Sequence, residues 1–164
     1  MINEVINAVK VLSSGGLILY PTDTVWGIGC DATNHEAVEK IYKIKKRKKE
    51  NALICLVSNI DMLKIYVPSI PKRYESLIND KTPTTVIYSN PLGVAQNLLA
   101  KDNSLGIRIP NHKFCNQLIT KFKKPIVSTS ANISQHKTPS KYSEIASTIL
   151  EGVDHVVNLQ KEQY

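Results

Sequence analysis

Polar and basic side chains gather in three short stretches of this sequence, each at the end of an apolar run that is typical of a buried strand. The run LILY is followed by Thr22, Asp23 and Thr24, and the stretch LGIRIP carries Arg108. The stretch STSANIS at 128–134 offers four hydroxyls and one amide. Ligands of α/β proteins bind at the ends of strands. If these strands lie side by side, the three stretches would line one cleft suited to an amino acid carboxylate beside a nucleotide triphosphate.

A basic segment, KIKKRKKEN at 43–51, could add cations to that cleft. It places six Lys and Arg residues within seven positions, at the end of an expected helix. Cations at a helix C-terminus also complement the helix dipole and face solvent, which is the common alternative. Arg47 favours a functional interpretation, because it is one of three arginines in the chain and an arginine fork grips phosphate well. For STSANIS, the alternative is a serine-rich turn with an Asx cap.

Several familiar catalytic patterns do not occur in the sequence. There is no Walker-type phosphate loop, no G-x-S-x-G elbow and no H-E-x-x-H motif. The stretch GIGCDA at 27–32 fits the loose dinucleotide pattern, but about 20 residues later only the lysine-rich segment around Glu50 follows, so we do not favour a Rossmann site. The three cysteines have no C-x-x-C spacing, which indicates neither a disulfide framework nor a zinc site. We therefore expect no metal held by the protein itself.

Composition limits the architecture and the class of partner. The chain has 164 residues, of which 42% are hydrophobic, and we expect one domain over 1–164 with a single core. The net charge of +7 favours anionic partners such as nucleotides and RNA. No apolar run approaches the roughly 20 residues that cross a bilayer, so we expect no membrane contact. Together with the cysteine pattern, this favours a reduced, cytoplasmic protein.

Periodicity and turn residues predict helices that alternate with strands. Apolar residues at helical spacing predict a first helix from Ile2 to Leu12 and a short one from Pro71 to about Ile78. The expected N-caps of the other helices are Asn34, Ser58 or Asn59, Asn111 and Ser140. Apolar runs predict strands at LILY, LICLV, TTVIYS, LGIRIP, PIVSTS and HVVNL. This order favours an α/β domain built on a twisted sheet.

Four blocks resemble, in order and approximate spacing, the YrdC family of threonylcarbamoyl-AMP synthases: YPTDTVWGIGCDA, KIKKRKKENALICLV, LGIRIPNH and STSANIS. The resemblance extends from about Leu17 to Pro139. It implies an open twisted sheet of mixed parallel and antiparallel strands, flanked by helices and curved around a concave basic cavity. It also implies a nucleotidyltransferase reaction, in which L-threonine, bicarbonate or carbon dioxide, and ATP give threonylcarbamoyl-AMP and pyrophosphate for threonylcarbamoyladenosine modification of tRNA.

The resemblance also implies roles for the residues that match the family's motifs. Thr24, Arg108 and Ser128 correspond to the L-threonine site. The ATP site corresponds to Arg47, Asn51, Ser104, Ser130, Asn132 and Thr138. The catalytic cations would be Lys45, Arg47 and Arg108, with Lys45 as a phosphate contact, and Mg²⁺ would be held mainly by ATP. The family commonly has a histidine where this chain has Leu56, which removes one expected threonine contact.

Two other classes of protein stay compatible with the sequence. A noncatalytic relative could bind tRNA or double-stranded RNA through a basic concave surface. An ATP-dependent enzyme for a different small carboxylate is the second alternative, because Leu56 changes the expected threonine site. For a synthase, the further expected partner is the downstream threonylcarbamoyl transferase machinery, which would receive the adenylate.

Overall fold

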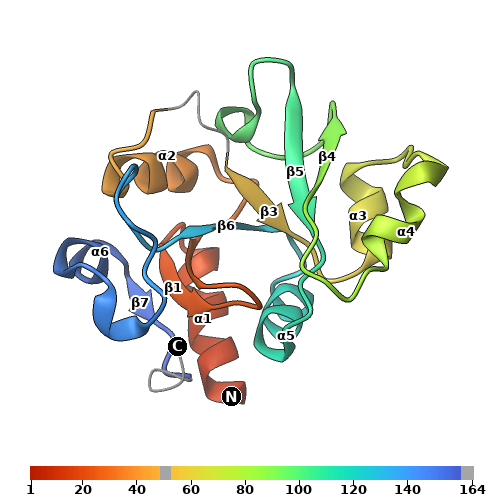
Figure 1. Ribbon diagram of the computed structural model, residues 1–164. Helices are drawn as coiled ribbons and strands as arrows, with labels where there is room; N and C mark the ends of the chain where they lie inside the picture. Colours follow the sequence, from red (N-terminus) through yellow and green to blue (C-terminus); the bar gives the residue numbers. More distant parts are fainter. Residues whose placement is uncertain (49–52, 160–164) are drawn as a thin grey trace.

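A seven-stranded mixed sheet forms the centre of the molecule (Figure 1). The computed structural model describes residues 1–48 and 53–159. The strands are β1 (Ile18–Pro21), β2 (Trp26–Gly29), β3 (Ile54–Leu56), β4 (Val86–Ser89), β5 (Ser104–Arg108), β6 (Ile126–Ser130) and β7 (His155–Val156). Their order is β4-β5-β3-β6-β2-β1-β7. The pairs β1/β7 and β3/β5 are parallel and the other neighbours are antiparallel, which confirms the expected mixed sheet.

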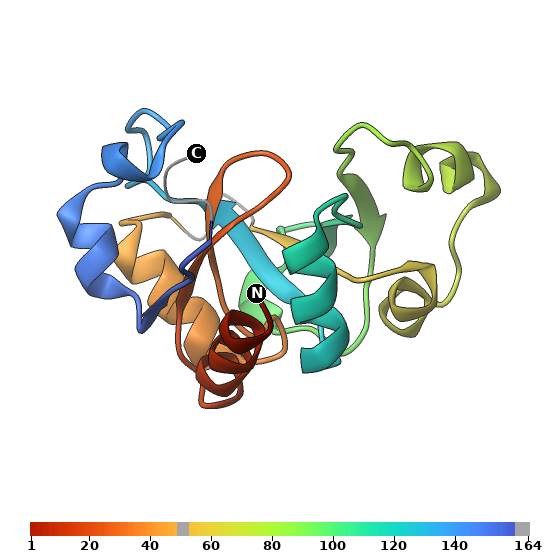
Figure 2. The ribbon, with the colours of Figure 1, turned by 90° about the horizontal axis from the view of Figure 1, so that it is seen from below.

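Helices cover both faces of this sheet. They are α1 (Ile2–Ser13), α2 (His35–Ile44), α3 (Ile60–Tyr66), α4 (Glu75–Ile78), α5 (Lys113–Phe122) and α6 (Ser147–Gly152), with short 3₁₀ turns η1 (Lys72–Tyr74), η2 (Gln96–Leu98) and η3 (Tyr142–Glu144). Helices α1 and α5 lie side by side on one face, and α2 and α6 pack together on the other. Figure 2 shows α3 and α4 projecting to one side of the sheet.

Alternation along the strands divides the core into two layers. In β1, Ile18 and Tyr20 face α1 and α5, whereas Leu19 belongs to the layer beneath α2 and α6. In β6, Ile126 faces α1 and α5 and Val127 faces the other way. Because both layers exclude water, the strands at the centre of the sheet are apolar on both faces, as the run LILY predicted.

Two of the expected helix caps are confirmed. The side chain of Asn34 accepts a hydrogen bond from the Ala37 N–H at the start of α2. Asn59 likewise accepts one from the Met62 N–H and begins α3. Each cap satisfies a backbone donor that the first turn of a helix leaves unpaired.

The other two expected caps are wrong. The residue that caps α5 is His112, whose Nδ1 accepts from the Cys115 N–H, and the Asn111 N–H instead donates to Asp23 Oδ2 at 3.1 Å. Ser140 precedes η3 rather than α6, and its N–H and hydroxyl both bond to the Glu144 carboxylate. Asn111 therefore binds an acceptor that is distant in the sequence instead of capping α5, and local sequence does not reveal such a contact.

The segment Trp26–Gly29 also differs from expectation. It forms β2, which pairs with both β1 and β6, although the sequence predicted no strand there. Two of its four residues are Gly27 and Gly29, which lower the strand signal because glycine has low β-propensity. The predicted helix from Pro71 to Ile78 is divided into η1 and α4.

Across the described residues, no helix has the length and apolar character needed to cross a membrane.

Candidate active site

Strand register places four of the expected site residues on one face of the sheet. Residues opposite each other in neighbouring strands share a face, and so do residues two apart along a strand. Ile54 of β3 lies opposite both Gly106 and Ser128. The face that contains Ile54 therefore also contains Ser104 and Arg108 of β5 and Ser128 and Ser130 of β6.

This face has a covered half and an open half. The covered half lies beneath α1 and α5 and is lined by fully buried apolar residues, namely Ile18, Tyr20, Leu56 and Ile126. The open half contains six less buried strand residues: Ile54, Ile87, Ser89, Ser104, Gly106 and Ser130. Ile87, opposite Gly106, is 65% exposed. Arg108 and Ser128 are 8% and 6% exposed and lie at the border between the two halves.

The polar stretches meet across this face and not at one shared edge. Strand β3 runs parallel to β5 and antiparallel to β6. The C-terminal ends of β5 and β6 therefore point in opposite directions along the sheet. Arg108 is level with Leu56 and Ile126, whereas Ser130 is paired with Gly27 farther along β6. The turn at 22–25 reaches Arg108 from the β1–β2 hairpin, as its contacts show.

The hairpin turn is held in shape by its own hydroxyls. The Thr22 hydroxyl donates to the Val25 carbonyl at 2.7 Å and accepts from the Thr24 N–H at 3.1 Å. It also lies 3.1 Å from the Thr24 hydroxyl. Thr22 is buried and Thr24 is exposed. The turn thus presents the Thr24 side chain on a fixed backbone.

Arg108 joins this turn to the sheet. Its Nη2 lies 3.5 Å from Thr24 Oγ1 and 3.1 Å from Asp23 Oδ1. Asp23 and Arg108 form an ion pair with side chains only 6% and 8% exposed. The sequence places Asp23 between two threonines but gives no sign of this pairing, because the partner of Asp23 lies on a strand far along the chain. The only indication of a role for Asp23 in the sequence is its position between Thr22 and Thr24.

Lys45 binds the loop that follows β6. Its ammonium donates to the Ser130 carbonyl, to the Asn132 carbonyl at 2.6 Å and to Asn132 Oδ1 at 3.5 Å. The Ser130 hydroxyl donates to the same Oδ1 at 2.5 Å. Lys45 is 1% exposed, and burial, followed by the charge of Arg47, lowers its pKa to about 8. Lys45, Ser130 and Asn132 are thus brought together, while the phosphate contact of Lys45 stays a prediction.

The remaining predicted residues are spread around the open half. Arg47 is half-buried just after α2, where its N–H donates to the Tyr42 carbonyl at 2.9 Å. Ser104 begins β5 and donates to Asp102 Oδ1 at 2.6 Å. Thr138 is exposed in the loop after Asn132. Asn51 lies outside the described residues.

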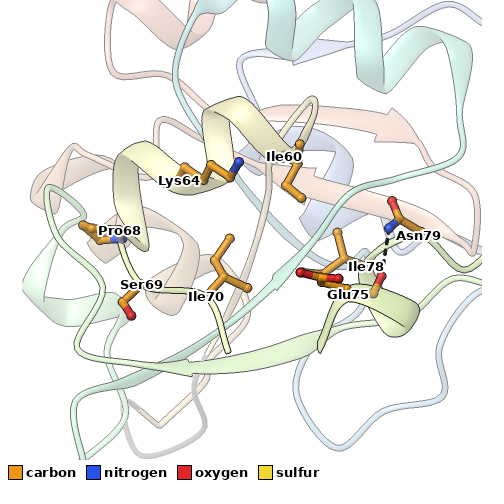
Figure 3. A pocket seen from close by; sticks show the side chains of 8 residues that line it. All are labelled: Ile60, Lys64, Pro68, Ser69, Ile70, Glu75, Ile78 and Asn79. Atoms are coloured by element: carbon orange, nitrogen blue, oxygen red, sulfur yellow. Dashed lines mark hydrogen bonds between the residues drawn. The ribbon is translucent and has the colours of Figure 1, made fainter. Parts of the chain in front are cut away.

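One cavity lies away from all of these residues. It has a volume of about 400 Å³, and Figure 3 shows its lining side chains converging from α3, α4 and the loop between them, including Lys64, Ile70, Glu75 and Ile78. None of the predicted site residues lines it. Within 1–48 and 53–159, no group of three or more His, Cys, Asp or Glu side chains is placed to hold a metal ion.

Comparisons with known proteins identify the family of this chain. The family model Sua5_yciO_yrdC, described as telomere recombination, matches residues 10–164. The threonylcarbamoyl-AMP synthase of Pseudoalteromonas translucida is 34% identical over 157 residues, covering 92% of this chain and 83% of the relative.

Two solved structures share the fold. The crystal structure of P. abyssi Sua5 complexed with L-threonine has a TM-score of 0.85 and 26% identity over 93% of this chain, which spans only 45% of that Sua5 chain. The crystal structure of E. coli YciO has a TM-score of 0.82 and 25% identity, covering 95% of this chain and 77% of YciO. With the family model matching nearly the whole sequence, the chain belongs to the Sua5/YciO/YrdC family.

Proposed function

We propose that this chain is an L-threonylcarbamoyladenylate synthase, which makes threonylcarbamoyl-AMP and pyrophosphate from L-threonine, bicarbonate or carbon dioxide, and ATP. The observation that carries the proposal is that Arg108, which contacts the Thr24 hydroxyl, shares one face of the sheet with Ser128 at the border of the open half. The synthase named in P. translucida and the L-threonine complex of P. abyssi Sua5 support the same substrate.

L-Threonine would bind at the border of the two halves. A guanidinium pairs well with a carboxylate, so Arg108 is the proposed contact for the threonine carboxylate. The hydroxyls of Thr24 and Ser128 would orient the amine and the substrate's own hydroxyl. Leu56 is fully buried among apolar residues of the covered half. We therefore assign no substrate contact to Leu56 in this chain.

ATP would extend over the open half from the threonine position. Its proposed contacts are Arg47, Asn51, Ser104, Ser130, Asn132 and Thr138, with Lys45 fixing the Ser130–Asn132 loop. Cations near the phosphates would stabilise the charge that develops in phosphoryl transfer. Mg²⁺ would enter on the ATP phosphates, because they and water supply the oxygen ligands that this ion prefers.

The reaction requires no protein nucleophile. The threonine ammonium releases two protons to solvent as its nitrogen bonds to carbon dioxide, which forms a carbamate. A carbamate oxygen then attacks the α-phosphorus of ATP, and the bond to the leaving pyrophosphate breaks. The protein's contribution would be to hold the carbamate in line with the phosphorus and to exclude water from the reacting atoms. The adenylate would then pass to threonylcarbamoyl transferase machinery that modifies tRNA.

A product assay tests the proposal. The purified protein is incubated with ATP, Mg²⁺, bicarbonate and L-threonine, and threonylcarbamoyl-AMP and pyrophosphate are measured by mass spectrometry. We expect product only when both threonine and bicarbonate are present, and a loss of at least ~1,000-fold in Arg108→Ala, because the contact for the threonine carboxylate and the buried charge partner of Asp23 are both removed.

The matched control for this assay is Arg73→Ala. Arg73 is an exposed arginine in η1 that stacks on Tyr74, so its removal changes the net charge equally and should leave product formation intact. If the wild type makes no product but binds RNA with strong salt dependence, the noncatalytic RNA-binding function replaces the synthase.

A further inference from the structure

The ion pair between Asp23 and Arg108 leaves two polar atoms without a hydrogen-bond partner. Asp23 Oδ1 lies 3.1 Å from Arg108 Nη2, yet it receives no hydrogen bond of good geometry, and Arg108 Nε donates none. Both atoms are buried. Buried polar atoms in folded proteins nearly always have a partner, so each exception calls for a physical reason. Here one unmet acceptor and one unmet donor belong to the same ion pair.

The backbone around the pair keeps Asp23 in place. The Asn111 N–H donates to Asp23 Oδ2 at 3.1 Å, which fixes one carboxylate oxygen and leaves Oδ1 beside Arg108. Thr24, next in sequence, is exposed, and its hydroxyl lies 3.5 Å from the same guanidinium. The exposed Thr24 side chain therefore marks the side from which a ligand headgroup would reach the pair.

We propose that Asp23 binds the ammonium group of the amino acid whose carboxylate binds Arg108, which makes Asp23 a specificity-determining residue for zwitterionic substrates. This inference rests on the proposed function. A free α-amino acid carries both complementary groups: its ammonium offers hydrogen bonds to Asp23 Oδ1, and its carboxylate accepts one from Arg108 Nε. Binding would replace one ion pair with two, so no buried charge loses its partner.

The same arrangement disfavours acids that lack an amine. Such a ligand would place its carboxylate and that of Asp23 on one guanidinium, with two negative charges against one positive charge. An unbalanced charge in a buried site is costly. The site should therefore select threonine over its analogue without the amine, 3-hydroxybutyrate, before any chemistry takes place.

Equilibrium binding tests this selection without turnover. Dissociation constants for L-threonine and (R)-3-hydroxybutyrate are measured by calorimetry in the wild type, in Asp23→Asn and in the control Asp80→Asn. Asp80 is an exposed turn residue that accepts from the Thr82 N–H, so its variant makes the same charge change away from the site. We expect Asp23→Asn to weaken threonine binding by ~30-fold and to leave 3-hydroxybutyrate binding unchanged or stronger.

Each outcome decides between explanations. Equal weakening of both ligands in Asp23→Asn would mean that Asp23 only positions Arg108, and would overturn the inference alone. If Asp23→Asn fails to fold, the wild type still decides: similar affinities for the two ligands would overturn the inference, and a preference for threonine of ~30-fold or more would support it. No threonine binding by the wild type would overturn the proposed function together with the inference.

Discussion

The covered and open halves of one sheet face differ in what their side chains do. In β6, Ile126 is completely buried beneath the helices, whereas Ser130, on the same face, is partly exposed. A similar change occurs along β5, from Gly106 in the open half to Arg108 at the border. Along β3 it runs from Ile54 in the open half to Leu56 in the covered half. One set of strands thus serves two purposes: large apolar residues of the covered half hold the fold, and the open half exposes polar side chains such as those of Ser104 and Ser130.

Truncating one apolar side chain in each half should separate these purposes most clearly. Leu56→Ala removes a fully buried side chain and should lower the free energy of unfolding by about 2–5 kcal/mol. Ile87→Ala removes a side chain that is 65% exposed and should change it by less than about 0.5 kcal/mol. Chemical denaturation of both variants measures the difference. Similar losses in the two variants would show that the open half also carries the fold.

Lys45, which binds the loop after β6, should make the stability of the folded protein depend on pH. The pKa of Lys45 is about 8 in the folded protein, against 10.5 for an unperturbed lysine, because burial disfavours its charged form. Between these values the unfolded chain binds more protons at this site, so this contribution makes the folded protein more stable as pH rises from about 8 to 10.5.

The variant Lys45→Met isolates this contribution. The free energy of unfolding of the wild type should rise relative to that of the variant by up to about 3 kcal/mol between pH 7 and pH 10.5. Urea titrations at several pH values give this difference, in which other titrating groups cancel. A constant difference across the range would mean that the pKa of Lys45 is not lowered.

Two glycines of β2 offer a smaller and closely matched comparison. A Cβ at Gly29 would lie 2.7 Å from Tyr20 Cε1 and 2.8 Å from the Val127 carbonyl oxygen, so something must shift. A Cβ at Gly27 would come no closer than 3.4 Å, to Ser128 Oγ. We expect Gly29→Ala to cost about 1–3 kcal/mol, and Gly27→Ala clearly less. Thermal unfolding of both variants provides the measurement, and a larger loss in Gly27→Ala would contradict the packing around Tyr20.

Local sequence predicted two helix starts because the capping contacts are local: Asn34 and Asn59 each accept from an N–H three residues away. It predicted β1 at Ile18–Pro21 because the continuous apolar run matches a strand that is buried on both faces. Strand β2 was missed because glycines lower its strand signal and its stability comes from pairing with β1 and β6. Pairing between distant segments has no local signature.

The candidate site was predictable in composition and not in geometry. The hydroxyls of Ser128 and Ser130 were expected in a polar stretch at the end of an apolar strand. The reach of the hairpin turn to Arg108 depends on how the sheet folds, and so does the Asp23–Arg108 ion pair. The family resemblance implied a phosphate contact for Lys45, which stays a prediction, whereas its contacts with the Ser130 and Asn132 carbonyls appear only in the folded chain.

The most direct test of the central claim is to locate the bound substrates by NMR. Backbone amide shifts of the wild type are followed while L-threonine and a non-hydrolysable ATP analogue with Mg²⁺ are added. We predict that the changes concentrate at 22–24, 104–108 and 128–132, and leave α1 and the cavity between α3 and α4 unaffected. Changes confined to that cavity, or to the helices of the covered half, would contradict the claim that the open half of the sheet is the active site.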